Sequence, residues 1–218
     1  MVNIAVYSQA STPLGLSLIN LTAALQRYVN DFVCPAWNTP ATLTAAFGPV
    51  PGSWGLVFED DADVSGALAY HTVQGLPLSK VFVRTILNNG ETISGAASHE
   101  LSEMLVDSGC EKTATRADGV QVALECADAC EETSFNVDGF SMSDFCLPAY
   151  FDPTTPVGTL LDHCNVLSKP FEIATGGYLS LLQNGQWSQV FGSLDKQARF
   201  AKEDRRGHRT ERRQLCTP

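Results

Sequence analysis

One amphipathic segment near the start of the chain constrains the fold most. Its apolar residues recur in steps of three or four: Leu14, Leu18, Leu21, Leu25, Tyr28 and Phe32. This spacing predicts a helix of roughly five turns with one buried face. Ser11, Thr12 and Pro13 predict where the helix begins, because hydroxyl residues and an early proline favour a helix start. The alternating residues of Val2–Ser8 predict a strand before it, so helix and sheet should share one core.

The later segments continue this mixture of strands and helices. Further strands are predicted at Trp54–Glu59, 66–71 and 80–86, and a second helix at 90–109. Beyond it the pattern predicts only short strands, at 120–125, 135–137 and 145–147, then a small hairpin of 178–182 with 187–191. This order fits an α/β or α+β class. We predict α+β, with a mixed sheet and an irregular C-terminal half.

Length and charge predict one domain with a basic tail. The 218 residues suit a domain at 1–195 and an appendage at 196–218. The net charge is −10, yet the tail carries +5 and the body −15. Phosphates would be repelled by such a body, so direct nucleic-acid binding by the body is not expected. The tail is either an assembly arm that binds an acidic partner or a solvated terminus.

Membrane insertion and secretion are not expected. No apolar run approaches the length of a membrane span, and the first residues show no basic segment of a secretory signal. The seven cysteines include no pair with the C-x-x-C spacing of structural zinc sites. We therefore predict a protein made in the cytosol with mostly buried, free thiols.

The residues 98–107, Ser-His-Glu-Leu-Ser-Glu-Met-Leu-Val-Asp, contain the most informative motif. On a helix, His99, Glu103 and Asp107 share one face, and Glu100 lies beside His99. The pattern is H-E-x-x-H with glutamate as the second ligand; in the parent motif the intervening glutamate activates water at a zinc ion. Carboxylate ligands favour oxygen-preferring metals, so zinc, another divalent metal or no metal stays open. The alternative interpretation is a polar helix face with no metal.

A second acidic segment offers a further ligand. Glu125 and Asp128 follow a predicted strand, and either would complete a three-residue metal site with His99 and Glu103. His71 ends the strand predicted at 66–71. It would bind substrate or metal, or have a purely structural role.

The order of these elements resembles the upper half of zincin metallopeptidases. More closely, the chain resembles a family of zincin-like proteins encoded in bacterial and tailed-phage genomes. The segments that carry the resemblance are 66–71, 75–77, 80–83, 98–107, 125–128, 143–151 and 176–178. The resemblance implies a zincin-like fold over about residues 1–180, a possible zinc ion as cofactor and extended peptides as substrates.

Carried over by position, the resemblance assigns roles to individual residues. It implies metal ligands at His99 and Glu103, with Glu125 or Asp128 completing the set, and a general base at Glu100. It also implies that the strand with Ala69, Tyr70 and His71 holds peptide by strand addition. Because most zincins have histidine where this chain has Glu103, we predict first a structural protein of a tailed-phage virion that contacts other virion proteins through its basic tail. The alternative is an active zinc-dependent peptidase that uses Glu100.

Overall fold

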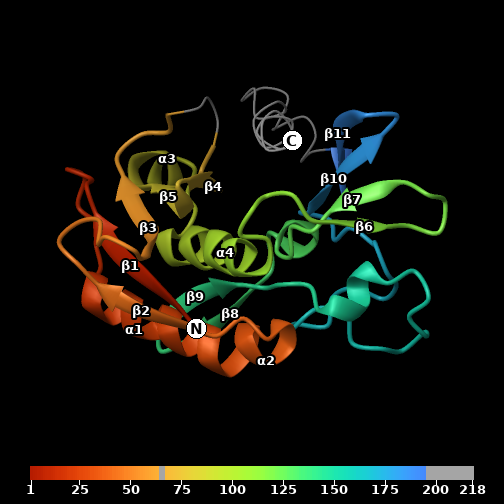
Figure 1. Cartoon of the computed structure of the whole chain (residues 1–218), viewed down its shortest axis with the longest axis horizontal. Helices are drawn as coiled ribbons and strands as arrows, with labels where there is room; N and C mark the ends of the chain where they lie inside the picture. Colours follow the sequence, from red (N-terminus) through yellow and green to blue (C-terminus); the bar gives the residue numbers. More distant parts are fainter. Residues whose placement is uncertain (64–66, 195–218) are drawn as a thin grey trace.

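The computed structural model of the chain describes residues 1–63 and 67–194 (Figure 1). Its largest element is a five-stranded mixed sheet with the strand order β2-β1-β3-β5-β4. The strands are β1 (Val2–Ser8), β2 (Ala41–Ala45), β3 (Trp54–Glu59), β4 (Ala69–Gln74) and β5 (Leu76–Phe82). All neighbours in this sheet are parallel except β4, which runs antiparallel to β5 at the edge. The α+β class with a mixed sheet is confirmed. The predicted tail at 196–218 lies outside the described residues.

A helix of about 20 residues follows β1, as predicted. It consists of α1 (Leu18–Tyr28), a π-helical turn (Val29–Val33) and α2 (Cys34–Trp37). The Cys34 N–H bonds to the Val29 carbonyl, the longer step of a π turn. Pro35 is accommodated at the start of α2, where a missing N–H does little harm. The helix buries Leu21, Leu25 and Tyr28 completely.

The predicted start of this helix was wrong. The helix begins at Leu18, where Ser17 caps it by accepting a hydrogen bond from the Asn20 N–H. The N–H groups of Ser11 and Thr12 donate instead to the two carboxylate oxygens of Asp60, at 2.9 and 2.7 Å. A partner 48 residues away along the chain therefore uses the groups that resembled a local cap.

The strand predicted at 80–86 was wrong in its second half. β5 ends at Phe82, and α3 (Val83–Asn88) begins directly after it. β-Branched residues favour strands, but Val83 and Ile86 lie three apart and are both fully buried on one side of a helical turn. Packing against the core thus overrides the local strand preference.

The helix α4 (Ile93–Val106) crosses the middle of the molecule (Figure 1). The side chain of Thr92 caps it by accepting a hydrogen bond from the Gly95 N–H. It packs against β4 and β5 on one side and against β9 (Phe140–Ser143) on the other. Every residue from Ala97 to Val106 is buried. The polar side chains of this helix therefore lie inside the protein.

The second half of the chain forms two small sheets and long irregular segments. The first sheet has the order β11-β10-β7-β6, built from β6 (Thr113–Thr115), β7 (Gln121–Ala123), β10 (Tyr178–Gln183) and β11 (Gln186–Phe191). The second pairs β8 (Ser134–Val137) with β9. The predicted hairpin at 178–191 is confirmed. The predicted strand at 145–147 was wrong, since only an isolated bridge from Cys146 to Asp162 forms there.

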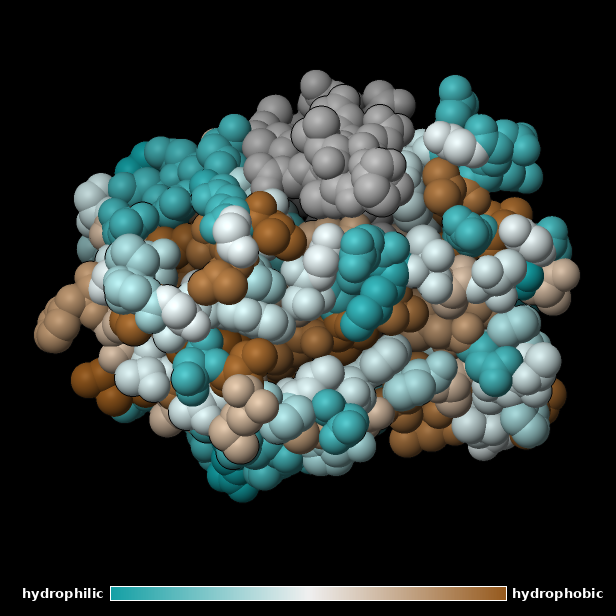
Figure 2. Space-filling model, viewed as in Figure 1, coloured by the Kyte–Doolittle hydropathy of each residue, from teal (hydrophilic) through white to brown (hydrophobic). Residues whose placement is uncertain are grey.

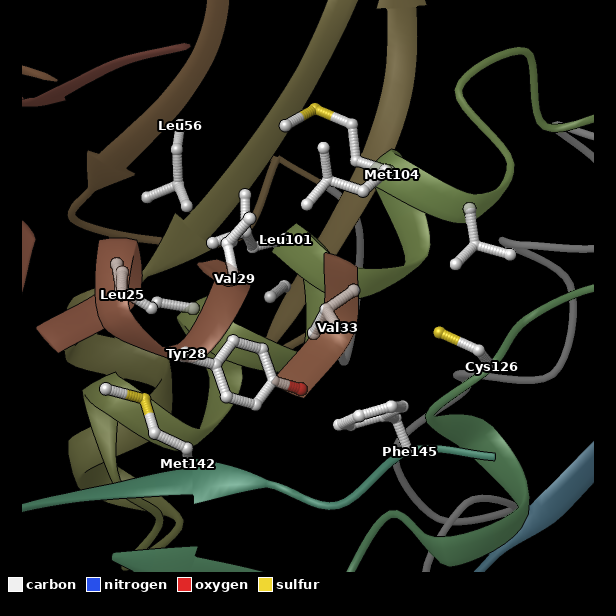
Figure 3. Close-up of a cluster of buried hydrophobic side chains, with 14 of the residues drawn as sticks. Leu25, Tyr28, Val29, Val33, Leu56, Leu101, Met104, Cys126, Met142 and Phe145 are labelled. Carbon is white, nitrogen blue, oxygen red and sulfur yellow. The ribbon is translucent and has the colours of Figure 1, made fainter. Parts of the chain in front are cut away.

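A single large apolar cluster joins both halves. Tyr28 is fully buried near Val29, Leu101 and Phe145, and its hydroxyl donates to the Ser143 carbonyl at 3.0 Å (Figure 3). The six described cysteines form no disulfide, so packing rather than crosslinking holds this region. On the surface in Figure 2, hydrophilic residues surround a band of apolar ones. No helix among residues 1–63 and 67–194 is long and apolar enough to cross a membrane.

The close approach of Gly177 to residues 128–130 predicts a sensitive position. A Cβ at Gly177 would lie 2.1 Å from the Ala129 carbonyl oxygen. We expect Gly177→Ala to lower the free energy of unfolding by about 2 kcal/mol or more, because backbone must move to admit the methyl group. Gly48→Ala, where no atom lies within 4 Å, should change it by no more than about 0.5 kcal/mol. Chemical denaturation measures both, and equal values would contradict the prediction.

The buried pair Asp144 and Asp162 predicts a pH dependence of stability. Burial and the adjacent Asp162 carboxylate raise the pKa of Asp144 from 3.8 to about 7. The folded protein thus binds more protons than the unfolded chain between those values, and this contribution to stability is lost as pH rises from about 4 to about 7. In the wild type the free energy of unfolding should therefore decrease over this pH range, and Asp144→Asn should make that decrease smaller by roughly 2–4 kcal/mol. Urea denaturation at about pH 4.5 and about pH 7.5 tests this. Identical pH slopes in both proteins would contradict it.

Candidate metal centre

The buried polar face of α4 meets a turn from the second half of the chain. His99 and Glu103 lie one helical turn apart on α4, and Asp128 begins the short 3-10 turn Asp128–Cys130. The Nε2 atom of His99 lies 3.3 Å from Glu103 Oε1 and 3.3 Å from Asp128 Oδ1. The three side chains are 7%, 0% and 1% exposed. A nitrogen and two carboxylate oxygens therefore converge in the interior.

The spacing of these atoms fits a metal ion. Zinc lies about 2.1 Å from nitrogen and oxygen ligands, and a tetrahedral arrangement then separates the ligand atoms by about 3.4 Å. Within the described residues, His99 Nε2 makes no contact with the geometry of a hydrogen bond. Side-chain nitrogen and oxygen atoms that approach one another closely without forming hydrogen bonds are typical of ligands that share a cation. One imidazole with two carboxylates suits zinc and also more oxygen-preferring divalent metals.

The backbone around Asp128 holds this arrangement in place. The N–H of Ala127 donates to Glu103 Oε1 at 3.3 Å, which fixes the carboxylate that faces His99. Gly177, at the start of β10, packs directly on the carbonyls of Ala129 and Asp128. Neither contact was predicted, because contacts of backbone groups that are distant in sequence follow no pattern of residue types.

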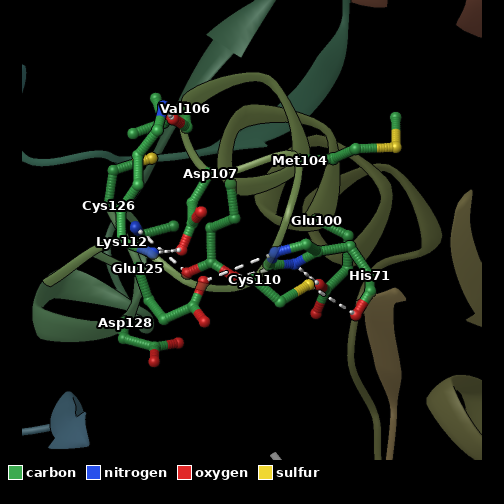
Figure 4. Close-up of polar contacts among 12 residues, drawn as sticks. His71, Glu100, Met104, Val106, Asp107, Cys110, Lys112, Glu125, Cys126 and Asp128 are labelled. Carbon is green, nitrogen blue, oxygen red and sulfur yellow. Dashed lines mark hydrogen bonds and ion pairs between the residues drawn. The ribbon is translucent and has the colours of Figure 1, made fainter. Parts of the chain in front are cut away.

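A second group of polar side chains adjoins the first (Figure 4). His71, on the edge strand β4, directs Nδ1 towards α4, 3.2 Å from Glu100 Oε2 and 3.7 Å from Glu103 Oε2. Its Nε2 lies 3.7 Å from Glu125 Oε2. All four residues are buried. The structure thus brings together two clusters that share Glu103.

The surroundings of both histidines favour positive charge. Burial alone lowers the pKa of His99, but the carboxylates of Glu103 and Asp128 outweigh it and raise that pKa well above its usual value. Burial likewise lowers the pKa of His71, and Glu125, Cys110 and Glu100 together raise it well above 6.5. The same negative potential attracts a metal cation.

The structure separates the predicted residues into those at this centre and those elsewhere. It brings together His71, His99, Glu100, Glu103, Glu125 and Asp128, with Asp128 rather than Glu125 against His99. Asp107 follows the last residue of α4, and its carboxylate accepts the N–H groups of Glu111 and Lys112, so it lies outside the set of converging atoms. Ala69 and Tyr70 are buried in β4, and the Tyr70 hydroxyl donates to Asp63 at 2.6 Å.

Comparison with known proteins gives no relative for this centre: no family model, curated protein or solved structure matches the chain.

Proposed function

We propose that this protein is a zincin-like, metal-dependent hydrolase of peptides. His99, Glu103 and Asp128 would hold the metal ion, zinc in the first instance, and Glu100 would act as general base. The observation that carries the proposal is the convergence of His99 Nε2, Glu103 Oε1 and Asp128 Oδ1 at 3.3 Å on a buried helix. The H-E-x-x-E spacing places Glu100 directly beside these ligands.

Each residue around the centre would have a separate role in hydrolysis. A zinc ion bound there supplies Lewis acidity towards a peptide carbonyl and lowers the pKa of water. Glu100 Oε2 would accept the proton of the attacking water and return it to the leaving amine. His71 Nδ1, 3.2 Å from Glu100 Oε2, would hold that carboxylate in one orientation. The low exposure of these side chains limits competing solvent, which strengthens their electrostatic effects.

The edge strand β4 supports a peptide as substrate. Among the described strands, β4 pairs only with β5, so its other edge has no strand partner there. An extended peptide can add to such an edge through main-chain hydrogen bonds. His71 on β4 would then place the peptide next to α4, while Ala69 and Tyr70 contribute backbone, because their side chains are buried.

Metal content tests the proposal directly. At a limiting free zinc concentration that fills only the His99 site, wild-type protein should contain about one zinc ion per chain by mass spectrometry, and His99→Ala should contain almost none. His163→Ala is the matched control, since His163 packs among Phe32, Phe135 and Phe145 instead of at the centre. Circular dichroism checks that each variant folds. Full zinc content in folded His99→Ala would refute the proposed site.

A structural metal site is the second candidate, and the burial of the ligands favours it. A centre whose side chains are 0–7% exposed would stabilise α4 against the Asp128 turn without turnover. In this form the protein would be a component of a tailed-phage virion, in line with its sequence resemblance. Chelation would then lower the melting temperature, and labelled casein would not be cleaved. Chelator-sensitive cleavage of casein would decide for the hydrolase.

A further inference from the structure

We infer that the protein has a second divalent-cation site, formed by His71, Glu100 and Glu103, which shares Glu103 with the first. The inference rests on the proposed function, because it takes the His99 site as already defined. The two oxygens of Glu103 face different histidines. Oε1 lies 3.3 Å from His99 Nε2, and Oε2 lies 3.7 Å from His71 Nδ1. A carboxylate in this position would be able to hold one ion with each of its oxygens.

The donor atoms of the second site are spaced as metal ligands are. His71 Nδ1 lies 3.2 Å from Glu100 Oε2 and 3.7 Å from Glu103 Oε2. These separations bracket the value of about 3.4 Å expected for tetrahedral ligands at about 2.1 Å from an ion. The three ligand atoms lie within 4.8 Å of one another, and all three residues are buried. Unlike His99 Nε2, His71 Nδ1 is within hydrogen-bond geometry of Glu100 Oε2, and a bound cation would replace that contact.

Glu125 supports the second site through the other ring nitrogen of His71. When Nδ1 of a histidine binds a metal, its Nε2–H is commonly directed at a carboxylate, which fixes the tautomer. Glu125 Oε2 lies 3.7 Å from His71 Nε2, the ring nitrogen that does not face Glu100 and Glu103. Glu125 is 5% exposed in its side chain, so its charge acts on the ring with little screening by solvent.

Charge balance also favours two ions. With neutral imidazoles, the carboxylates of Glu100, Glu103, Glu125 and Asp128 give this buried region a formal charge of −4. One divalent ion leaves −2 uncompensated, or −1 when His71 is protonated, whereas two ions neutralise the region; uncompensated charge is costly in the interior. Sites with two metal ions occur in several classes of hydrolase.

Occupancy of the second site would control the proposed chemistry. A cation that takes Glu100 Oε2 as a ligand prevents this oxygen from accepting a proton. The second ion would therefore suppress hydrolysis through Glu100, and activity would peak when only the His99 site is filled. The cation class is a divalent metal that accepts nitrogen and oxygen ligands, such as Zn²⁺ or Mn²⁺.

Equilibrium dialysis of metal-free, full-length protein against rising free Zn²⁺ tests the inference. Wild type and His163→Ala should saturate at about two ions per chain, and His71→Ala and the more conservative His71→Asn at about one. Thermal melting confirms that the variants fold. Because His71 variants could be unstable, Mn²⁺ electron paramagnetic resonance of wild type gives a second measurement. Two ions bridged by Glu103 should show exchange coupling, whereas isolated ions give separate six-line spectra.

The outcomes separate this inference from the proposed function. Saturation of wild type at one ion that His99→Ala loses would leave the proposed function intact and overturn the second site. Two uncoupled ions, or two ions in the folded His71 variants, would overturn it as well. Absence of any ion dependent on His99 would refute the proposed function itself.

Discussion

Glu100→Gln should reduce cleavage of labelled casein by about 10²–10⁴-fold while the protein still folds and binds metal. A general base contributes this much to catalysis, and an amide cannot accept the proton of the attacking water. The change is nearly isosteric, so contact with His71 Nδ1, now 3.2 Å from the carboxylate, should persist. The loss corresponds to about 3–5 kcal/mol in the activation free energy. Initial rates at limiting metal measure it.

Two controls make this result specific to the carboxylate of Glu100. At limiting zinc, where only the His99 site fills, zinc content by mass spectrometry should match that of the wild type, because Glu100 is not one of the ligands of that site. Glu172→Gln alters a glutamate that accepts hydrogen bonds from Ser168 and Lys169 far from α4 in sequence, and its rate should be unchanged. Wild-type rates in Glu100→Gln would eliminate the proposed base.

Asp128→Asn should weaken binding of the first zinc ion by roughly 100-fold or more, whereas Glu125→Gln should leave it within about tenfold. Loss of a group that only orients a ligand costs 10–100-fold in affinity, so loss of a ligand should cost at least the upper value. Asp128 Oδ1 lies 3.3 Å from His99 Nε2, whereas Glu125 faces His71. Competition with a chromophoric chelator measures both affinities.

This matched pair resolves the ligand that the sequence left open. Asp128 and Glu125 are acidic residues on the same short segment, and both are buried. The prediction therefore does not depend on charge or burial, which the two share, but on which histidine each one faces. A larger loss in Glu125→Gln than in Asp128→Asn would place the first ion at His71 and refute Asp128 as a ligand of the first ion.

Local patterns in the sequence determined the elements whose periodicity is strong. The apolar steps of three and four predicted a long helix after β1, observed at 18–37, and a second helix that contains α4. They also placed His99, Glu100 and Glu103 on adjacent positions of one helix, because the helical repeat alone fixes that relation. Where the same residues fit both a strand and a helix, as at Val83 and Ile86, the pattern predicted the wrong element.

Only the tertiary structure decided how these elements meet. The edge position of β4 directs His71 at α4, and the packing of Gly177 on the Ala129 carbonyl sets the place of Asp128. Such relations join residues distant in sequence, and no periodicity encodes them. The sequence thus determined which residues can bind a metal, by their chemistry and helical spacing. The folded chain decided which of them converge, because convergence depends on long-range packing.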